Sequence, residues 1–210
     1  MKKDEVLELL LKLEEMYPDA KSGLDFKNPY ELLIATILSA QTTDVQVNKV
    51  TKNLFQKYPN PQKLSEAGLE DVISTIKTIG LYRNKAKNII LTAQILVNDF
   101  SSQVPKTMEE LLLLPGVGRK TANVVLSSAF SIPSIAVDTH VFRVSNRLGI
   151  SNSENVLDCE KELREKIPRQ WWSKSHHLLI AHGRNLCKAR GPLCHECSLK
   201  AICLYFSMVK

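Results

Sequence analysis

Residues 111–130 read LLLLPGVGRKTANVVLSSAF, and this stretch decides how the rest of the chain is interpreted. The pattern predicts a leucine-rich helix that ends at Pro115, a tight turn over residues 116–118, and a second apolar helix that begins at Arg119 or Lys120. Two glycines allow the turn to reach positive φ and leave its amide N–H groups uncovered by side chains. Together with the N-terminus of the second helix, such a turn can hold a phosphate group.

Two nucleotide-binding motifs do not fit this turn. The dinucleotide fingerprint requires a third glycine where Thr121 stands, and the P-loop requires a glycine directly before its lysine, where this chain has Arg119. The glycines alone therefore leave two interpretations open, a phosphate-binding hairpin and a plain helical corner.

Lys120 lies in the first turn of the second predicted helix, at the positive end of the helix dipole. That position disfavours a charged amine, and a neutral amine is a nucleophile. A solvated lysine that makes one more backbone phosphate contact is the simpler explanation of the position alone. Residues later in the chain must decide between the two roles.

The composition is that of a globular protein with one or two domains. Of its 210 residues 44% are hydrophobic and 24% are charged, and the net charge of +6 is compatible with a polyanionic partner. No apolar run approaches the length of a membrane span, and the acidic, amphipathic N-terminus is unlike a signal peptide. We expect a cytoplasmic protein with no membrane partner.

Every element that the sequence predicts is helical, so the expected fold class is all-α. Apolar residues at helical spacing predict long helices over residues 3–17, 29–38, 83–100, 155–167 and 175–182. Shorter helices are expected to end at Phe55 and Ile79. The one strand-like run, residues 132–137, is broken by Pro133 and is too short to start a sheet.

Local capping signals mark where several of these helices begin. Asn28 is followed by Pro29 at the first helical position, and Thr107 with Glu110 forms a capping box before the helix that leads into the hairpin. Residues 79–89 echo the hairpin spacing and fit either a second, degenerate hairpin or an unrelated helix start.

Asp138 stands where the extended run 132–137 turns into a helix, in the segment VDTHVFRVSNRLG. A helix N-cap is the default explanation for an aspartate at such a position. A carboxylate that folds back beside Lys120 would instead make a familiar catalytic pair. Both roles remain open on this evidence.

Four of the five cysteines fall within seventeen residues, with the spacing C-x6-C-x2-C-x5-C from residue 187 to residue 203. Disulfides are a poor interpretation for a chain without a secretory signal, which leaves a four-thiolate metal site. Structural zinc usually takes two separated C-x2-C pairs, so the compact spacing favours an iron–sulfur cluster while zinc stays open. Cys159 lies outside the run on a predicted helix and is expected to be a core thiol.

Taken together, LPGVGRKTANVV, VDTHVFRVSNRLG and the cysteine run resemble the endonuclease III family, the bifunctional DNA glycosylases of the helix-hairpin-helix superfamily. The resemblance covers nearly the whole chain. It implies that Lys120 is the nucleophile and Asp138 its carboxylate partner. It also implies that a [4Fe-4S] cluster is held by Cys187, Cys194, Cys197 and Cys203.

The same resemblance implies which residues contact DNA. SAQTTD and GLYRNKAKN are similar to the two loops that the family inserts into DNA, which points to Gln41 and Leu81 as residues that fill the gap left by a flipped base. The expected contacts to the DNA backbone come from the hairpin and from the basic cluster loop, namely Gly116, Val117, Gly118, Arg119, Lys188 and Arg190.

The chain departs from the family at two places. Gly191 and Leu193 stand in ARGPLC where further basic residues are common, so weaker DNA contact by this loop is expected. The tyrosine that usually precedes the first cysteine is also absent from GRNLCK.

The fold implied by the resemblance has two domains. A helical barrel is expected over residues 22–132, with the helix-hairpin-helix at about 108–130. A discontinuous cluster domain is expected over residues 1–21 and 133–210, with the cluster loop at 187–203.

The implied activity is base excision repair by a monomer associated with the nucleoid. The enzyme would flip damaged, oxidised pyrimidines out of duplex DNA, remove them, and cleave the abasic site by β-elimination through a lysine Schiff base. Two alternatives compete with this function. Adenine mismatch glycosylases generally lack the hairpin lysine and carry a further domain, and a non-catalytic DNA-binding module needs no pair of Lys120 and Asp138.

Overall fold

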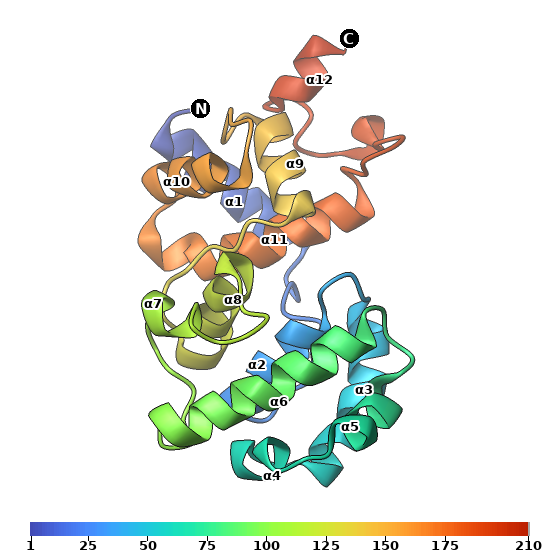
Figure 1. The fold of residues 1–210 in the computed structure, drawn as a ribbon. Coiled ribbons are helices and arrows are strands. Elements are labelled where there is room, and N and C mark those ends of the chain that lie inside the picture. The colour runs from blue at the N-terminus through green and yellow to red at the C-terminus, as the bar shows by residue number, and fades with distance from the viewer. Residues whose placement is uncertain (210) are drawn as a thin grey trace. The chain divides into compact units, whose positions relative to one another are not determined.

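The computed structural model describes residues 1–209 and is helical, which confirms the predicted all-α class. Within these residues there are twelve α-helices, two short 3-10 helices and no strand. The chain divides into two compact units (Figure 1), of which unit 1 comprises Met1–Lys21 and Pro133–Lys210 and unit 2 comprises Ser22–Ile132. None of the helices in the described part is long and apolar enough to cross a membrane.

Unit 2 is built around α2 (Pro29–Leu38), in which nine of the ten residues are buried. Helix α2 packs against α3, α6 and α8. A fully buried leucine or isoleucine contributes about 1.5–3 kcal/mol, so this helix supplies much of the stability of the unit. The other helices of unit 2 are α3 (Asp44–Lys57), α4 (Pro61–Ser65), α5 (Leu69–Ile76), α6 (Tyr82–Asp99), α7 (Met108–Leu111) and α8 (Arg119–Phe130).

Unit 1 has a separate apolar core, to which α1, α9 and α11 contribute fully buried leucines and valines. Helix α11 packs against α1 and α9, and the C-terminal helix α12 packs against α9. The elements of this unit are α1 (Lys3–Met16), α9 (Thr139–Leu148), α10 (Val156–Lys166), η1 (Arg169–Trp171), α11 (Trp172–Asn185), η2 (Cys194–Glu196) and α12 (Leu204–Met208).

The predicted N-cap bonds are present, but the capping box predicted at Thr107 is incomplete, because the Glu110 carboxylate accepts from the Thr107 hydroxyl at 2.7 Å and not from the Thr107 amide. The Asn28 side chain accepts a hydrogen bond from the Glu31 amide at 2.9 Å, and the Thr107 side chain accepts one from the Glu110 amide at 3.3 Å. Each cap satisfies an amide that has no partner inside its own helix, which explains why these helices begin where they do. As expected, Cys159 is fully buried in the core of unit 1.

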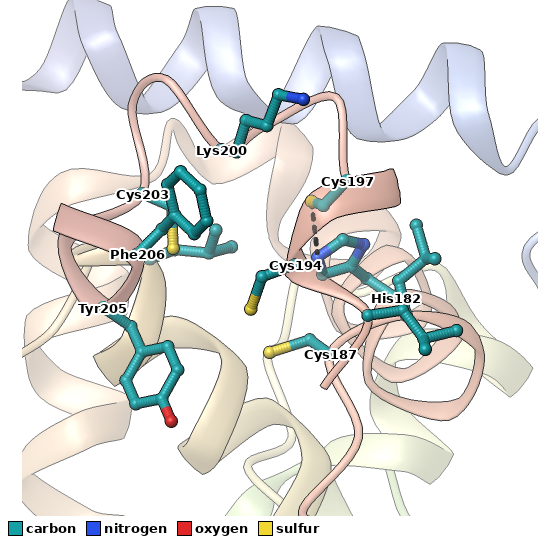
Figure 2. Close-up of a pocket in the computed structure, with 11 residues that line it drawn as sticks. His182, Cys187, Cys194, Cys197, Lys200, Cys203, Tyr205 and Phe206 are labelled. Atoms are coloured by element: carbon teal, nitrogen blue, oxygen red, sulfur yellow. Dashed lines mark hydrogen bonds between the residues drawn. The ribbon is translucent and has the colours of Figure 1, made fainter. Parts of the chain in front are cut away.

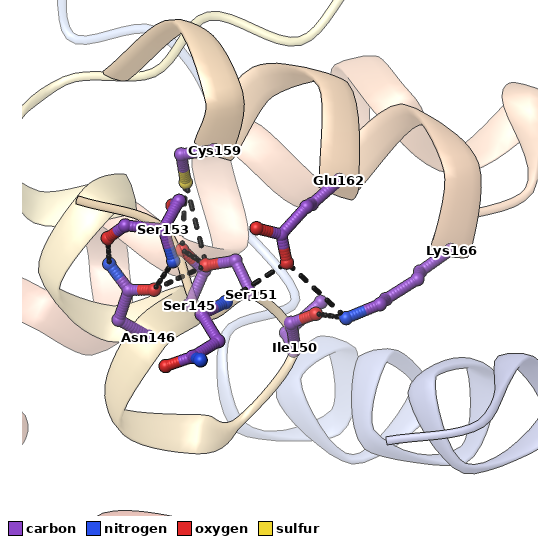
Figure 3. Close-up of polar contacts among 9 residues, drawn as sticks. Ser145, Asn146, Ile150, Ser151, Ser153, Cys159, Glu162 and Lys166 are labelled. Carbon is purple, nitrogen blue, oxygen red and sulfur yellow. Dashed lines mark hydrogen bonds and ion pairs between the residues drawn. The ribbon is translucent and has the colours of Figure 1, made fainter. Parts of the chain in front are cut away.

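The connection between α9 and α10 is fixed by a buried polar cluster (Figure 3). The Ser151 hydroxyl donates to Ser145 Oγ at 2.9 Å, and both hydroxyls lie within 3.5 Å of the Cys159 sulfur. Asn146 closes the turn, because its side chain donates to the Ser153 carbonyl and accepts from the Ser153 amide. These bonds satisfy polar groups that would otherwise be buried without partners.

Four expectations about helix ends are wrong, the smallest difference being that α3 ends at Lys57 rather than at Phe55. The leucine-rich helix before the hairpin ends at Leu111 rather than at Pro115, because the Leu113 and Leu114 amides bond three residues back and tighten the chain. Helix α5 ends at Ile76 rather than at Ile79. Helix α11 extends well beyond the predicted range in both directions, since apolar periodicity does not report its polar ends.

Candidate functional site

The turn between α7 and α8 depends on one glycine rather than two. Gly116 has φ +80 and supplies the positive φ that the sequence predicts for the turn, whereas Gly118 has an extended backbone with φ −96 and acts as the N-cap of α8. A Cβ on Gly116 would lie 2.9 Å from Asn88 Nδ2 and 3.1 Å from Ile37 Cγ2. The backbone therefore packs directly onto α2 and α6, where no side chain fits.

The hairpin is also tied to α6 by a hydrogen bond. The Thr92 hydroxyl, on a fully buried residue, donates to the Pro115 carbonyl at 3.0 Å. Val117 is buried and packs into the core of unit 2, so the hairpin can offer its backbone rather than this side chain to a ligand.

The N-terminus of α8 has the features of an anion site. No side chain among the described residues caps it, and Gly118, Arg119 and Lys120 are all exposed. Uncapped amides and the positive end of the helix dipole attract phosphate. Lys120 thus lies in the first turn of α8, at an N-terminus that can hold an anion.

The two loops expected to insert into DNA lie beside each other in unit 2. Gln41 and Leu81 are both exposed, and both adopt left-handed backbones with φ 55 and φ 58. A Cβ on Gly80 would lie 3.9 Å from the Gln41 carbonyl oxygen, so the two backbones approach closely. Residues 79–89 differ from the central hairpin, because positive φ falls on Leu81 and not on Gly80.

Asp138 is the N-cap of α9, in unit 1. Its Oδ1 accepts a hydrogen bond from the Val141 amide at 2.8 Å, and its backbone is extended. Among the described residues its second carboxylate oxygen has no hydrogen-bond partner. The capping role and a chemical role are therefore compatible, since one oxygen fixes the side chain and the other stays available.

The four clustered cysteines line one cavity in unit 1 (Figure 2). Cys187, Cys194, Cys197 and Cys203 are free thiols, and all four line this cavity. Burial raises the pKa of Cys197 and of Cys203. A bound metal reverses this preference, because a coordinating thiol is deprotonated by the charge of the metal. Within residues 1–209, no three His, Cys, Asp or Glu side chains converge on a point that fits a single metal ion.

A chain of hydrogen bonds reaches one of these cysteines from the N-terminal helix. Burial lowers the pKa of His182 to about 4 and raises the pKa of Tyr17 to about 12, so both side chains are neutral at pH 7. The Tyr17 hydroxyl lies 3.1 Å from His182 Nδ1, and His182 Nε2 lies 3.7 Å from the Cys197 sulfur. If Tyr17 donates to Nδ1, the one ring proton of His182 faces that sulfur.

Two arginines of α9 hold the basic loop that follows the first cysteine. Arg147 donates to the Lys188 carbonyl at 2.7 Å and to the Ala189 carbonyl at 3.2 Å, and Arg143 donates to the Cys187 carbonyl at 3.1 Å. Lys188 and Arg190 are exposed at the surface of this loop.

The two departures in the cluster loop have clear positions. Leu193 lines the cysteine cavity, and Gly191 has φ +60 with open space where a Cβ would be. Leu193 therefore contributes to packing around the cavity. Gly191 only shortens the run of basic residues in the loop.

Three further residues matter here that the sequence did not single out, namely Thr92, Lys85 and His182. Each is a buried polar residue. Buried polar groups must find partners, and partners distant in sequence leave no local pattern. In the sequence, these residues could have been noticed only as polar residues on an otherwise apolar helix face.

Residues 34–169 match the model of the HhH-GPD superfamily base excision DNA repair proteins. Endonuclease III of Bacillus subtilis is 52% identical over 193 residues, which is 91% of this chain and 88% of that protein. Endonuclease III of Escherichia coli K12 is 48% identical over 205 residues, which is 98% and 97% of the two chains.

Solved structures agree with these sequence relatives. A trapped endonuclease III–DNA covalent intermediate superposes with a TM-score of 0.93 at 48% identity, covering 100% of this chain and 99% of that one. A thermostable thymine-DNA glycosylase superposes with a TM-score of 0.83 at 25% identity, covering 98% and 97%.

Proposed function

This chain belongs to the endonuclease III family of the HhH-GPD base excision repair proteins, and we propose that it acts on oxidised pyrimidines in duplex DNA through Lys120 and Asp138. Members of this family are bifunctional, with DNA glycosylase and abasic-site lyase activities. The observation that carries the proposal is Lys120, exposed in the uncapped first turn of α8 directly after the hairpin. Adenine mismatch glycosylases and non-catalytic modules have no need of a lysine there.

In this mechanism Lys120 is the nucleophile. Its amine attacks the sugar C1′, the C1′–N bond breaks, and the damaged base leaves with a proton. The sugar ring opens to give an iminium ion between Lys120 and C1′. This cation acidifies the C2′ proton, and its removal expels the 3′ phosphate by β-elimination. Water then hydrolyses the iminium and regenerates the amine.

Asp138 supports this step with the carboxylate oxygen that its cap does not use. The hydrogen bond from the Val141 amide fixes the side chain. The available oxygen can accept the lysine proton or stabilise the cationic sugar, and both actions favour the transition state more than the ground state.

DNA binding is assigned to the hairpin, the two adjacent loops and the basic loop. The exposed amides at Gly116, Gly118 and Arg119 would hold the backbone without reading sequence. Gln41 and Leu81 would enter the space left by the flipped nucleotide. Lys188 and Arg190 would add charge contacts to phosphates.

A [4Fe-4S] cluster is the cofactor that the cysteine cavity fits best. Four free thiols from one short segment line a common pocket, and their compact spacing is typical of cluster ligation rather than of the two separated C-x2-C pairs of structural zinc. Cys187, Cys194, Cys197 and Cys203 would each bind one iron. The bound cluster would supply a covalent staple for the end of unit 1. Purified protein should contain iron and little zinc; metal analysis with the reverse result would exclude the cluster.

Borohydride trapping tests the catalytic assignment. Lys120→Gln should abolish the covalent adduct with lesion DNA, while binding largely survives because one lysine is only part of the backbone contact. Lys63→Gln, on the exposed surface of α4, is the matched control and should trap normally. Undiminished trapping by Lys120→Gln would remove the nucleophile from that position.

The carboxylate is tested separately by Asp138→Asn. Asparagine caps a helix about as well as aspartate, so thermal stability should change little. Single-turnover base removal should slow by about 100-fold or more, as expected for loss of a group that acts in the transition state. A near-normal rate would leave Asp138 as a helix cap only.

A panel of duplexes that each carry one lesion tests the substrate class. Activity should concentrate on oxidised pyrimidines. Activity confined to adenine mispairs would favour the mismatch glycosylases instead.

A further inference from the structure

Lys85 is a buried cation in the first turn of α6, directly after the loop that carries Leu81. Only 4% of the residue is exposed, and burial lowers the pKa of its amine. No carboxylate in the described part of the chain forms an ion pair with it. Burying a charged amine without a carboxylate partner costs free energy. The hydrogen bonds of the amine must therefore compensate for that cost.

The Lys85 amine bonds to the neighbouring loop on both sides of Gln41. Nζ donates to the Ala40 carbonyl at 2.7 Å and to the Thr42 hydroxyl at 3.0 Å. Both bonds are charge-assisted and part-buried, which makes them stronger than neutral surface bonds. They restrain the backbone immediately before and after Gln41.

The same residue also bonds to the second loop, through its backbone. The Lys85 amide donates to the Leu81 carbonyl at 3.1 Å and so closes the first turn of α6. Lys85 therefore bonds to Leu81 with its main chain and to the neighbours of Gln41 with its side chain. One further bond joins the loops at a distance from the tips, from Gln46 Nε2 to Thr78 Oγ1 at 2.9 Å.

The geometry of Gln41 and Leu81 explains why such a restraint is needed. Both residues carry a Cβ and hold left-handed backbones, which are unfavourable for L-residues outside glycine. An unrestrained loop would relax to an extended or right-handed conformation. That change would redirect each side chain away from its exposed position.

We propose that Lys85 is a positioning residue that fixes the spacing and direction of Gln41 and Leu81 so that both can enter the duplex together. The proposal rests on the proposed function, in which these two side chains fill the gap left by a flipped nucleotide. Lys85 itself is buried and touches no substrate in this role. Its effect is confined to the step in which the nucleotide leaves the helix.

The first experiment separates nucleotide flipping from chemistry. A duplex with one oxidised pyrimidine next to 2-aminopurine reports unstacking by fluorescence, and an abasic site in single-stranded DNA needs no flipping. Lys85→Met keeps the length of the side chain and removes its donors. It should slow flipping and duplex excision by about tenfold, while borohydride trapping on the single strand stays within about twofold of the native rate.

The matched control is Lys52→Met, which removes one charge from an exposed position on α3 of the same unit, outside both loops. It should flip the lesion at nearly the native rate. Should Lys85→Met fold poorly, Thr42→Val removes one of the two acceptors and should slow flipping by about threefold. Native flipping rates in both Lys85→Met and Thr42→Val would overturn the proposal. It would also be overturned if Lys85→Met slowed borohydride trapping on the single strand as much as it slowed excision from the duplex.

A double-mutant cycle distinguishes this proposal from the function on which it rests. Gln41→Ala and Leu81→Ala should each slow flipping, and adding Lys85→Met to Gln41→Ala should cost less than the two changes separately, because residues that act together are not additive. If Gln41→Ala and Leu81→Ala both flip normally, the inserting loops are wrongly assigned. If they are slow and the Lys85 effect is fully additive, only the positioning role fails.

Discussion

The two units use different chemistry to stay folded. Unit 1 contains all five histidines, all five cysteines and both tryptophans of the chain, and unit 2 contains none of these residues. Unit 2 depends on aliphatic packing around α2, a helix with nine buried residues. Unit 2 is thus stabilised mainly by close packing of aliphatic side chains, while unit 1 combines a smaller apolar core with titratable side chains and with the four cysteines proposed to bind a cluster.

The contrast is sharpest at the C-terminal end of unit 1. Between residues 187 and 209 the only elements are η2 and α12, with three and five residues, and only Cys197 and Leu199 are buried. Helices this short are not stable by themselves. We therefore expect the segment to depend on the cluster proposed for its cysteines, whereas the proposed DNA-contacting residues of unit 2 lie on or directly beside packed helices.

The largest expected effect comes from removing one cysteine ligand. Cys197→Ser should release iron and unfold much of unit 1, because metal binding of this kind is coupled to folding. Both tryptophans lie in unit 1, so intrinsic fluorescence reports its loss while hydrogen exchange follows the helices of unit 2. Cys159→Ala is the control, since that buried thiol lies outside the cavity and its loss should leave the iron content unchanged. If the Cys197→Ser protein contained no iron and unit 1 still kept its native fold, unit 1 would not depend on a bound cluster and would not differ from unit 2 in this respect.

A smaller effect is expected at the hairpin of unit 2, where shape is decisive. Gly116→Ala combines positive φ with a Cβ 2.9 Å from Asn88 Nδ2, so it should destabilise by about 1–3 kcal/mol and weaken DNA binding. Gly118→Ala is the matched control, because its φ is −96 and nothing lies within 4 Å of the added Cβ. Thermal unfolding and DNA titration measure both. Equal costs at the two positions would mean that the hairpin tolerates a side chain and is not packed as described.

Local signals in the sequence were sufficient for some of these features. The caps at Asn28, Thr107 and Asp138 were predictable because each lies within three residues of the amide that it binds. The shared site of the four cysteines was also predictable from local sequence. Its four members are close in sequence and also line one cavity.

Features that depend on distant partners could not be predicted. The Lys85 amine bonds to a carbonyl 45 residues earlier, and Tyr17 meets His182 across 165 residues. The sequence could not show which of the two hairpin glycines has the positive φ, because a glycine permits positive φ without requiring it. Only the packing of Gly116 against α2 and α6 distinguishes the two glycines.

The smallest expected effect is a difference between the two units in how their stability depends on pH. Burial lowers the pKa of His177, so this side chain stays neutral in the folded protein at a pH where the unfolded chain is already protonated. The unfolded state then binds more protons than the folded state. Unit 1 should therefore lose stability as the pH falls below about 6.5, the ordinary value for histidine, and regain it above that value.

Thermal unfolding at pH 7.5 and pH 5.5, followed by tryptophan fluorescence, measures this loss. His177→Phe keeps an aromatic ring beside His176 and removes the titrating group, so its unfolding temperature should depend less on pH than that of the native protein. Unit 2 has no histidine and serves as the internal control, because its hydrogen-exchange protection should change little over the same range. An identical pH dependence in the native protein and in His177→Phe would assign the acid sensitivity of unit 1 to its other titratable groups.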